Sequence, residues 1–271
     1  DLNMFERMLY NRNKRVCESS HTILNEWMMM MRRPLAHKIL TGKVKQLGDP
    51  KGKNPMDRPW QSGMFKTEVD ERIWLGETGL QGDEVADTKN HGGPEKAVFA
   101  YPIKHYDYWQ KDLQLDSIGV GAMGENLAVL DMDELSVCIG DIYKFGDAVI
   151  QVSQPRRPCW KPARRFRIID FALRIQDSGR TGWYFRVLQR GYVQPGTHLQ
   201  LIERSNREWT IAACNEVMYI HKADLRLAEK LIACEPLAEN WKRSLKKRIL
   251  GQSSSIEKRV FGPNKDGSHR S

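Results

Sequence analysis

One cysteine, Cys159, lies in a segment whose residue types favour a reactive thiolate. The segment reads Gln154-Pro-Arg-Arg-Pro-Cys-Trp160 and follows a strand-like run at residues 148–153. Proline restricts φ and disfavours helix in the residue before it, so we expect the thiol on a stiff, extended loop. Nearby cations favour the thiolate, which attacks electrophiles and binds soft metals. These cations are Arg156, Arg157, Lys161, Arg164 and Arg165. A buried structural cysteine beside an exposed basic stretch is an equally open interpretation.

Two glycine-containing loops offer further polar groups. His91-Gly-Gly-Pro94 follows Gly82-Asp83 along the chain. Paired glycines let a ligand approach main-chain amides, and a histidine supplies a donor, an acceptor or a base near neutral pH. A hairpin loop without a binding role is the alternative for this segment. Similarly, Gly124-Glu125-Asn126 either presents two polar side chains to a heterocycle or forms a solvated turn.

Several other chemistries find no support in the motifs. Residues 119–124 match the pattern G-x-G-x-x-G, but no strand leads in and no helix leads out, so we interpret them as a turn. Zinc-ligand spacing of the H-x-x-x-H type is missing, as is a G-x-S-x-G elbow for a hydrolytic serine. We interpret the helical His105 as structural.

Composition indicates a soluble globular protein with an anionic partner. The chain has 271 residues, 28% of them charged, and a net charge of +9. Nucleic acid and a phosphate-bearing cofactor would both suit that charge. No apolar run approaches the roughly 18 residues of a membrane span. The five cysteines are scattered and form no C-x-x-C pair, which favours a reducing, cytoplasmic setting.

The chain divides into four parts by pattern. Residues 1–35 show no clear period, and we expect a disordered or weakly docked extension. Residues 36–204 show short strands punctuated by Gly, Pro and Asp, which is typical of a sandwich or barrel. Helical patterns interrupt these strands at 102–113 and 168–178. The expected strands are 38–44, 64–69, 72–75, 96–101, 126–129, 141–145, 148–153, 183–188 and 198–202.

The last two parts follow Arg204. Apolar residues at helical spacing predict three helices at 210–219, 224–233 and 238–250. We therefore place a small three-helix domain at 205–251. We expect a flexible tail at 252–271, within which Val260-Phe261 can dock.

Taken in order, short motifs of this chain resemble those of one family. They are Ser62-Gly-Met-Phe-Lys66, Gly79-Leu-Gln-Gly-Asp83, His91-Gly-Gly-Pro94, Gly124-Glu-Asn-Leu127, Gly140-Asp141 and Gln154-Pro-Arg-Arg-Pro-Cys159. Each motif is weak, but their joint order is specific. The chain resembles the MOSC domain, the molybdenum-cofactor sulfurase C-terminal domain, and within it the bacterial YiiM type. The resemblance implies a mainly β, barrel-like domain with peripheral helices, followed by that subfamily's three-helix domain.

The resemblance also implies a function. It predicts a molybdenum-dependent oxidoreductase that reduces N-hydroxylated purines and amines, such as 6-N-hydroxylaminopurine, as a detoxification. The molybdenum cofactor (molybdopterin) would be held through the Cys159 thiolate. We expect electrons to come from a separate reductase, and homodimerisation is a further expectation. We do not expect pyridoxal phosphate, a membrane or nucleic acid as a partner. A persulfide carrier using Cys159, and a nucleic-acid or protein-binding role of the basic three-helix domain, are the alternatives.

The candidate site residues follow from the matched motifs and their chemistry. His91 is the candidate for proton delivery. The candidates for the pterin's phosphate are Lys66, Arg156, Arg157 and Arg164, which can form charge-assisted contacts. The remaining candidates for cofactor or substrate are Asp83, His91, Asn126, Gln154 and the amides of Gly92 and Gly93.

Overall fold

The computed structural model describes residues 33–252 and 255–265, all but the first within the compact unit Pro34–Ser271. The extension expected at 1–35 lies almost entirely outside the described residues. Where the description begins, Leu35 already belongs to a strand.

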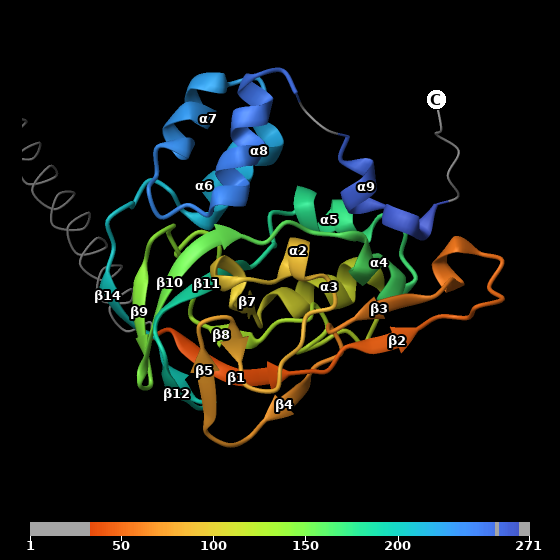
Figure 1. Cartoon of the computed structure of the whole chain (residues 1–271), viewed down its shortest axis with the longest axis horizontal. Coiled ribbons are helices and arrows are strands. Elements are labelled where there is room, and N and C mark those ends of the chain that lie inside the picture. Colours follow the sequence, from red (N-terminus) through yellow and green to blue (C-terminus); the bar gives the residue numbers. More distant parts are fainter. Residues whose placement is uncertain (1–32, 253–254, 266–271) are drawn as a thin grey trace, which may run out of the picture. The chain divides into compact units, whose positions relative to one another are not determined.

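The described elements are mostly short strands, with helices concentrated after residue 204 (Figure 1). The strands are β1 (Leu35–Thr41), β2 (Lys45–Leu47), β3 (Trp60–Ser62), β4 (Thr67–Val69), β5 (Ile73–Gly76), β6 (Gly79–Leu80), β7 (Val98–Pro102), β8 (Leu127–Leu130), β9 (Ile142–Phe145), β10 (Ala148–Pro155), β11 (Trp183–Gln189), β12 (Gly191–Val193), β13 (Thr197–His198) and β14 (Gln200–Glu203). The helices are α2 (Thr88–His91), α3 (His105–Leu113), α4 (Trp160–Phe166), α5 (Phe171–Asp177), α6 (Ile211–Asn215), α7 (Leu225–Ile232), α8 (Glu239–Ile249) and α9 (Glu257–Val260). Short turns of other helix types are η1 (Pro55–Asp57), η2 (Pro94–Lys96), the π-helix η3 (Glu216–Ile220) and η4 (Gly262–Asn264).

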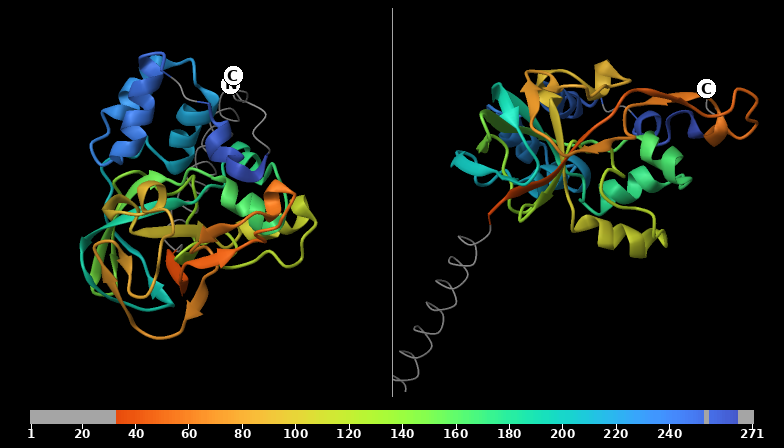
Figure 2. Two further views of the ribbon diagram at one scale, coloured as in Figure 1. Left: turned by 45° about the vertical axis from the view of Figure 1, so that its right-hand side comes forward. Right: turned by 90° about the horizontal axis from the view of Figure 1, so that it is seen from below.

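A curled mixed sheet forms the centre of this unit (Figures 1 and 2). Among the described residues it has nine strands, in the order β13-β1-β8-β7-β11-β10-β9-β14, with β4 also paired to β1. The β7–β8 pair is parallel and the other pairs are antiparallel. The expected class, a mainly β, barrel-like domain with peripheral helices, is therefore confirmed.

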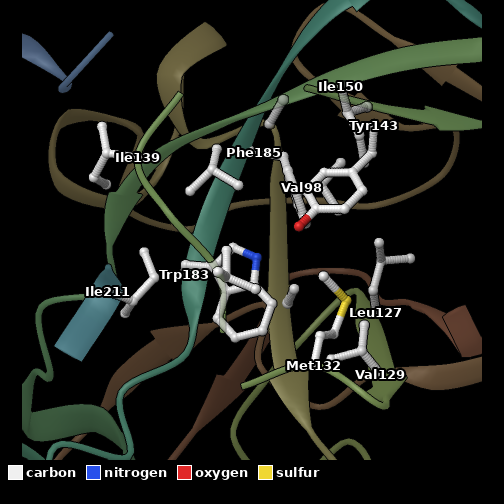
Figure 3. Close-up of a cluster of buried hydrophobic side chains, with 14 of the residues drawn as sticks. Val98, Leu127, Val129, Met132, Ile139, Tyr143, Ile150, Trp183, Phe185 and Ile211 are labelled. Carbon is white, nitrogen blue, oxygen red and sulfur yellow. The ribbon is translucent and has the colours of Figure 1, made fainter. Parts of the chain in front are cut away.

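The central strand β7 is buried on both of its faces. Side chains alternate along a strand, so Val98 and Ala100 face one apolar cluster whereas Phe99 and Tyr101 face another. All five residues of β7 are buried. The first cluster includes Trp183, Phe185 and Tyr143 (Figure 3). A strand buried on both faces forms a rigid base on which neighbouring loops can hold a site.

The C-terminal helices share their core with the sheet. Figures 1 and 2 show α6, α7 and α8 grouped together next to β10. Leu231 of α7 and Trp241 of α8 belong to the same cluster as the strand residues. The Trp241 indole Nε1 donates a hydrogen bond of 3.1 Å to the carbonyl of Pro155, the last residue of β10. The expectation of a small three-helix domain after the sheet is therefore confirmed.

Two local expectations need correction. We expected an extended loop around Cys159, but α4 begins immediately after it, at Trp160. Pro162 does not prevent this helix, because proline is tolerated in a first helical turn, where amides lack intrahelical acceptors. In the tail expected to be flexible, the described part forms α9 and η4, and Val260 and Asn264 are buried. The burial of Val260 agrees with the expectation that Val260-Phe261 can dock, whereas the side-chain hydrogen bonds that hold this segment could not be inferred from its Gly/Ser/Lys-rich composition.

Candidate functional site

Most of the candidate residues line a single cavity, although they come from distant parts of the sequence. It lies among the loops that connect the strands of the sheet. Six of the candidates line it, namely Lys66, Asp83, His91, Asn126, Arg156 and Cys159. The tertiary structure therefore brings the cysteine, the histidine and the polar network into contact with one space.

Cys159 is positioned at the end of an extended segment, directly before α4. Its backbone is extended, with φ −126° and ψ 172°, and its side chain is only 7% exposed. Burial by itself would raise the pKa of the thiol. The charge of His91 and its hydrogen bond to the thiol, together with Arg156 and the main-chain N–H of Lys161, outweigh burial and lower the pKa to about 6. The thiol is therefore mainly thiolate at neutral pH.

His91 is held by the short helix α2. The Asp87 side chain caps this helix by accepting a hydrogen bond from the Asn90 main-chain N–H at 3.0 Å. Burial would raise the pKa of Asp87, but the bonds from Asn90 and the charges of His91 and Lys161 lower it. Asp87 also lines the cavity. A carboxylate, a histidine and a lysine therefore line the same cavity as the thiol.

A buried network connects Lys66, Asp83 and Asn126. Lys66 and Asp83 form an ion pair whose side chains are 6% and 9% exposed. Burial lowers the pKa of Lys66, and the charge of Asp83 partly opposes this effect. Asp83 also accepts a hydrogen bond from Asn126 Nδ2 at 2.8 Å. An ammonium has three donors, so Lys66 can bind a ligand in the cavity while it keeps Asp83 as a partner.

Asn126 has a largely architectural role in this network. Its Oδ1 accepts from the Phe99 main-chain N–H at 3.1 Å, and its Nδ2 also donates to the Leu40 carbonyl at 3.2 Å. These contacts join β1, β7 and the start of β8. The amide therefore fixes the strands and orients the Asp83 carboxylate.

Arg156 is the arginine of the cysteine segment that faces the cavity. It is 4% exposed and its guanidinium lies 5.0 Å from the centre of the Phe99 ring. Burial raises the pKa of Tyr184 to about 12, although the charge of Arg156 opposes the shift. Nη1 of Arg156 has no hydrogen-bond partner among the described residues. An unpartnered, buried cationic donor in a cavity wall is suited to an anionic ligand.

Five other candidates do not line this cavity. Arg157 donates from Nη1 to Ser244 Oγ on α8 at 2.8 Å. Gln154 is buried beneath the cavity wall, and its Oε1 has no partner among the described residues. Gly92 and Gly93 connect α2 to η2, and of the two only Gly93 has a positive φ, of 94°.

Arg164 is likewise directed away from the cavity. Its guanidinium donates to main-chain carbonyls of Pro55, Arg58 and Pro263, and its Nε donates to Asn264 Oδ1 at 2.8 Å. These contacts make it a connector between separate segments, whereas we had suggested it as a phosphate ligand.

Besides Asp87, three residues that were not among the candidates for cofactor or substrate binding line the cavity. Lys96 donates to the Asn90 carbonyl at 2.7 Å, and burial lowers its pKa, with the charges of Arg157 and Arg243 adding to the effect. Lys161 and Tyr184 complete the set. The sequence indicated Lys161 as one of the cations near the thiol, but not as a residue that lines a binding cavity. Tyr184 could not be inferred from the sequence, because it reaches the site only through its pairing with Gln154 across β10 and β11.

Among the remaining motifs, Met123 and Gly124 line the cavity, whereas Glu125 and His105 do not. Glu125 is fully buried and its Oε1 accepts hydrogen bonds from the Tyr106 hydroxyl and, at 2.7 Å, from the Gly121 N–H. His105 pairs with Glu134 at 2.7 Å. Residues 120–123 form a turn, as expected for the rejected dinucleotide pattern. In the described ranges, no group of three His, Cys, Asp or Glu residues has an arrangement for a metal ion, and no helix is long and apolar enough to cross a membrane.

Comparisons with known proteins agree with this architecture. The MOSC domain matches residues 87–200, and the YiiM-like 3-alpha helix domain matches residues 209–252. The chain is 37% identical to YflK of Bacillus subtilis, covering 74% of this chain and 91% of that protein. It is 35% identical to YiiM of Escherichia coli, covering 83% of this chain and 97% of that protein. A longer protein of Gibberella moniliformis named as a reductase is 38% identical over 61% of this chain and 30% of its own length.

Solved structures show the same likeness. The crystal structure of YiiM from Geobacillus stearothermophilus has a TM-score of 0.67 at 32% identity, covering 80% of this chain and 99% of that one. YiiM from Escherichia coli gives a TM-score of 0.66 at 32% identity, covering 72% and 94%. The chain therefore belongs to the MOSC-domain family, among the YiiM-like proteins with a C-terminal three-helix domain.

Proposed function

We propose that this chain is a molybdenum-dependent reductase of N-hydroxylated purines and amines that holds its cofactor through Cys159. The observation that carries the proposal is the thiol of Cys159, which faces a cationic cavity and has a pKa lowered to about 6. Family membership supports molybdenum-cofactor binding, and the likeness to the fungal reductase supports redox chemistry.

The residues of the cavity fit the cofactor. A thiolate is the soft ligand that a dithiolene-bound molybdenum accepts. Arg156 Nη1 is buried without a partner in the described part of the chain, and Lys66, Lys96 and Lys161 share its cavity. Phosphate on a pterin would find charge-assisted donors here.

Within this proposal each side chain has a definite task. Cys159 supplies the ligand sulfur. Lys66 and Arg156 bind the anionic end of the cofactor, and Asp83 holds the Lys66 ammonium in place. When bound, the cofactor would supply the two-electron reduction that removes oxygen from an N-hydroxyl group. His91, on the thiol side of the cavity, would donate a proton to the departing oxygen.

Two further proposals concern the source of electrons and the cellular compartment. We propose that a separate reductase supplies the electrons, because the sequence has no flavin or iron–sulfur motif. We further propose that the protein works in a reducing, cytoplasmic compartment, since the described cysteines Cys138, Cys159, Cys214 and Cys234 are all unpaired.

The decisive experiment is metal and pterin analysis of protein made in a host that synthesises molybdenum cofactor. Wild type and Cys138→Ala should carry molybdenum and pterin near stoichiometry, and Cys159→Ala should lose both. Cys138 is a matched control because it is equally buried and lies outside the cavity. Reduction of 6-N-hydroxylaminopurine with an artificial electron donor would then test the substrate class.

Failure to bind cofactor would be informative. If neither the purified wild type nor protein incubated with added cofactor contains molybdenum, the reductase proposal is wrong. A persulfide mass increment on Cys159 in the same sample would instead support the sulfur-carrier alternative.

A further inference from the structure

The main chain on both sides of Cys159 is contacted by side chains from residues 257–264, near the end of the chain. Arg259 Nη1 donates a hydrogen bond to the carbonyl of Pro158, the residue before the cysteine. Asn264 Nδ2 donates to the carbonyl of Trp160, the residue after it, at 3.1 Å. Both contacts come from α9 and η4, which lie beyond the three-helix domain matched at 209–252.

Buried side chains and hydrogen bonds hold residues 257–264 against the rest of the fold. Val260 is fully buried and Asn264 is 4% exposed. Asn264 Oδ1 accepts from Arg164 Nε at 2.8 Å, and Arg164 Nη2 donates to the Pro263 carbonyl at 3.2 Å. Helices as short as α9 are not stable by themselves in water, so these contacts hold the segment in place. Figure 1 shows α9 close to α5 and α4.

Gly262 provides a third contact beside the cysteine. Its φ is +48°, and a Cβ at this position would lie 2.3 Å from Cδ1 of Trp160. The Trp160 indole therefore packs directly on the glycine backbone. A side chain at this position would displace the residue that follows Cys159.

Arg259 is an unusual residue to find in such a contact. Its hydrogen-bond partners are the Pro158 carbonyl and, at 2.6 Å, Gln176 Oε1, and its guanidinium lies 5.9 Å from the centre of the Tyr219 ring. No ion pair of the described residues includes Arg259. Burial lowers its pKa, as do the charges of Arg157 and Arg156, whereas Tyr219 and Cys159 raise it. The half-buried guanidinium therefore holds the Pro158 carbonyl although other cations lie nearby.

We infer that residues 257–264 form a C-terminal clasp that fixes the backbone around Cys159, with Arg259 and Asn264 as positioning residues for the thiol. The clasp would hold the carbonyls of Pro158 and Trp160 so that the sulfur stays directed into the cavity. The inference rests on Cys159 being the reactive thiol of the proposed function, and it does not depend on molybdenum.

The test uses the full chain produced without molybdenum cofactor, so that its outcome is separate from cofactor binding. The variants are Arg259→Ala, Arg259→Lys and Asn264→Asp. Asn264→Asp keeps an acceptor for Arg164 but loses the donor to Trp160. The matched control is Lys258→Ala, an exposed position on the same helix. Thermal unfolding of each variant establishes that it is folded.

Two measurements report on the clasp. Hydrogen exchange of peptides covering 156–166 should become faster in Arg259→Ala and Asn264→Asp, while peptides from β7 and β11 stay unchanged. Iodoacetamide labelling of Cys159 at alkaline pH, followed by peptide mass spectrometry, should accelerate by about fivefold, the population change that loss of one net hydrogen bond produces. Arg259→Lys, which keeps the charge and a donor, should restore most of the wild-type rate.

The outcomes distinguish a role in positioning Cys159 from a role in general stability. If Arg259→Ala and Asn264→Asp match Lys258→Ala in both measurements, the C-terminal clasp does not position Cys159 and the inference is wrong. Equal acceleration in Arg259→Lys and Arg259→Ala, with exchange raised throughout the chain, would assign Arg259 to general stability and would also overturn it.

Discussion

His91 and Cys159 line the same cavity, and the charge of His91, on a short helix before β7, lowers the pKa of the thiol in the segment after β10. The pair unites a titratable imidazole with a thiol that is otherwise enclosed. Burial alone would leave this thiol protonated, so its reactivity depends on the partner.

Replacing His91 should raise the pKa of Cys159. In the cofactor-free protein, the labelling rate of Cys159 should rise through a midpoint at about pH 6, because the pKa is lowered to that value. Burial raises the pKa of the thiol, and His91→Ala removes the largest of the contributions that oppose this effect. The midpoint should therefore move to higher pH by about one unit or more. Peptide-resolved alkylation across the pH range measures it.

Three other cysteines within the described residues provide an internal control for this experiment. Burial raises the pKa of Cys138 and Cys214, and raises that of Cys234 to about 11. They should label slowly over the same range. His37→Ala, a surface change in β1, should leave the Cys159 midpoint in place. An unchanged midpoint in His91→Ala would show that His91 does not activate the thiol.

Substitutions of the neighbouring residues Arg156 and Arg157 should have very different effects on cofactor binding. Arg156→Gln removes a cationic donor from the cavity, and loss of one charge-assisted contact should weaken cofactor binding by about tenfold to a hundredfold. Arg157→Gln should bind nearly as well as wild type, because Arg157 contacts Ser244 instead. Molybdenum content after dialysis compares them. Equal losses in both variants would contradict the assignment of Arg156.

Removing Lys66 alone should destabilise the protein more than removing both members of the Lys66–Asp83 pair. Lys66→Met leaves a buried carboxylate without its cation, and we expect it to lower the free energy of unfolding by about 3 kcal/mol. The double variant Lys66→Met/Asp83→Leu should recover part of that loss. Urea unfolding of the four proteins in this cycle gives the coupling directly. Additive losses would show that the two groups are not coupled.

The sheet and the three-helix domain should unfold together. Leu231, Trp241 and Leu245 share one apolar cluster with Trp183 and Phe185, so neither part has a separate core. Tryptophan fluorescence and circular dichroism should therefore report one coincident transition. Trp241→Ala should lower the free energy of unfolding by about 3–5 kcal/mol, and by the same amount whichever signal is followed. Two separated transitions would mean that the helices form an independent unit.

Local pattern was enough to predict the elements and the family. The three C-terminal helices follow apolar residues at helical spacing, and the expected strand at 148–153 falls within β10. The family resemblance rested on the order of short motifs, and the comparisons confirm it. Helix α4 escaped prediction because the prolines before and within it suggested an extended chain, whereas its first turn tolerates proline.

The sequence by itself determined which residue types are available, namely a cysteine among cations, a histidine beside two glycines, and Lys66, Asp83 and Asn126 in separate motifs. Only the tertiary structure decided which of them meet. Arg156 faces the cavity, Arg157 faces α8 and Arg164 connects distant segments, although all three are close in sequence. The physical reason is that a side chain's direction depends on strand register and on contacts made across the fold, which spacing along one chain does not encode.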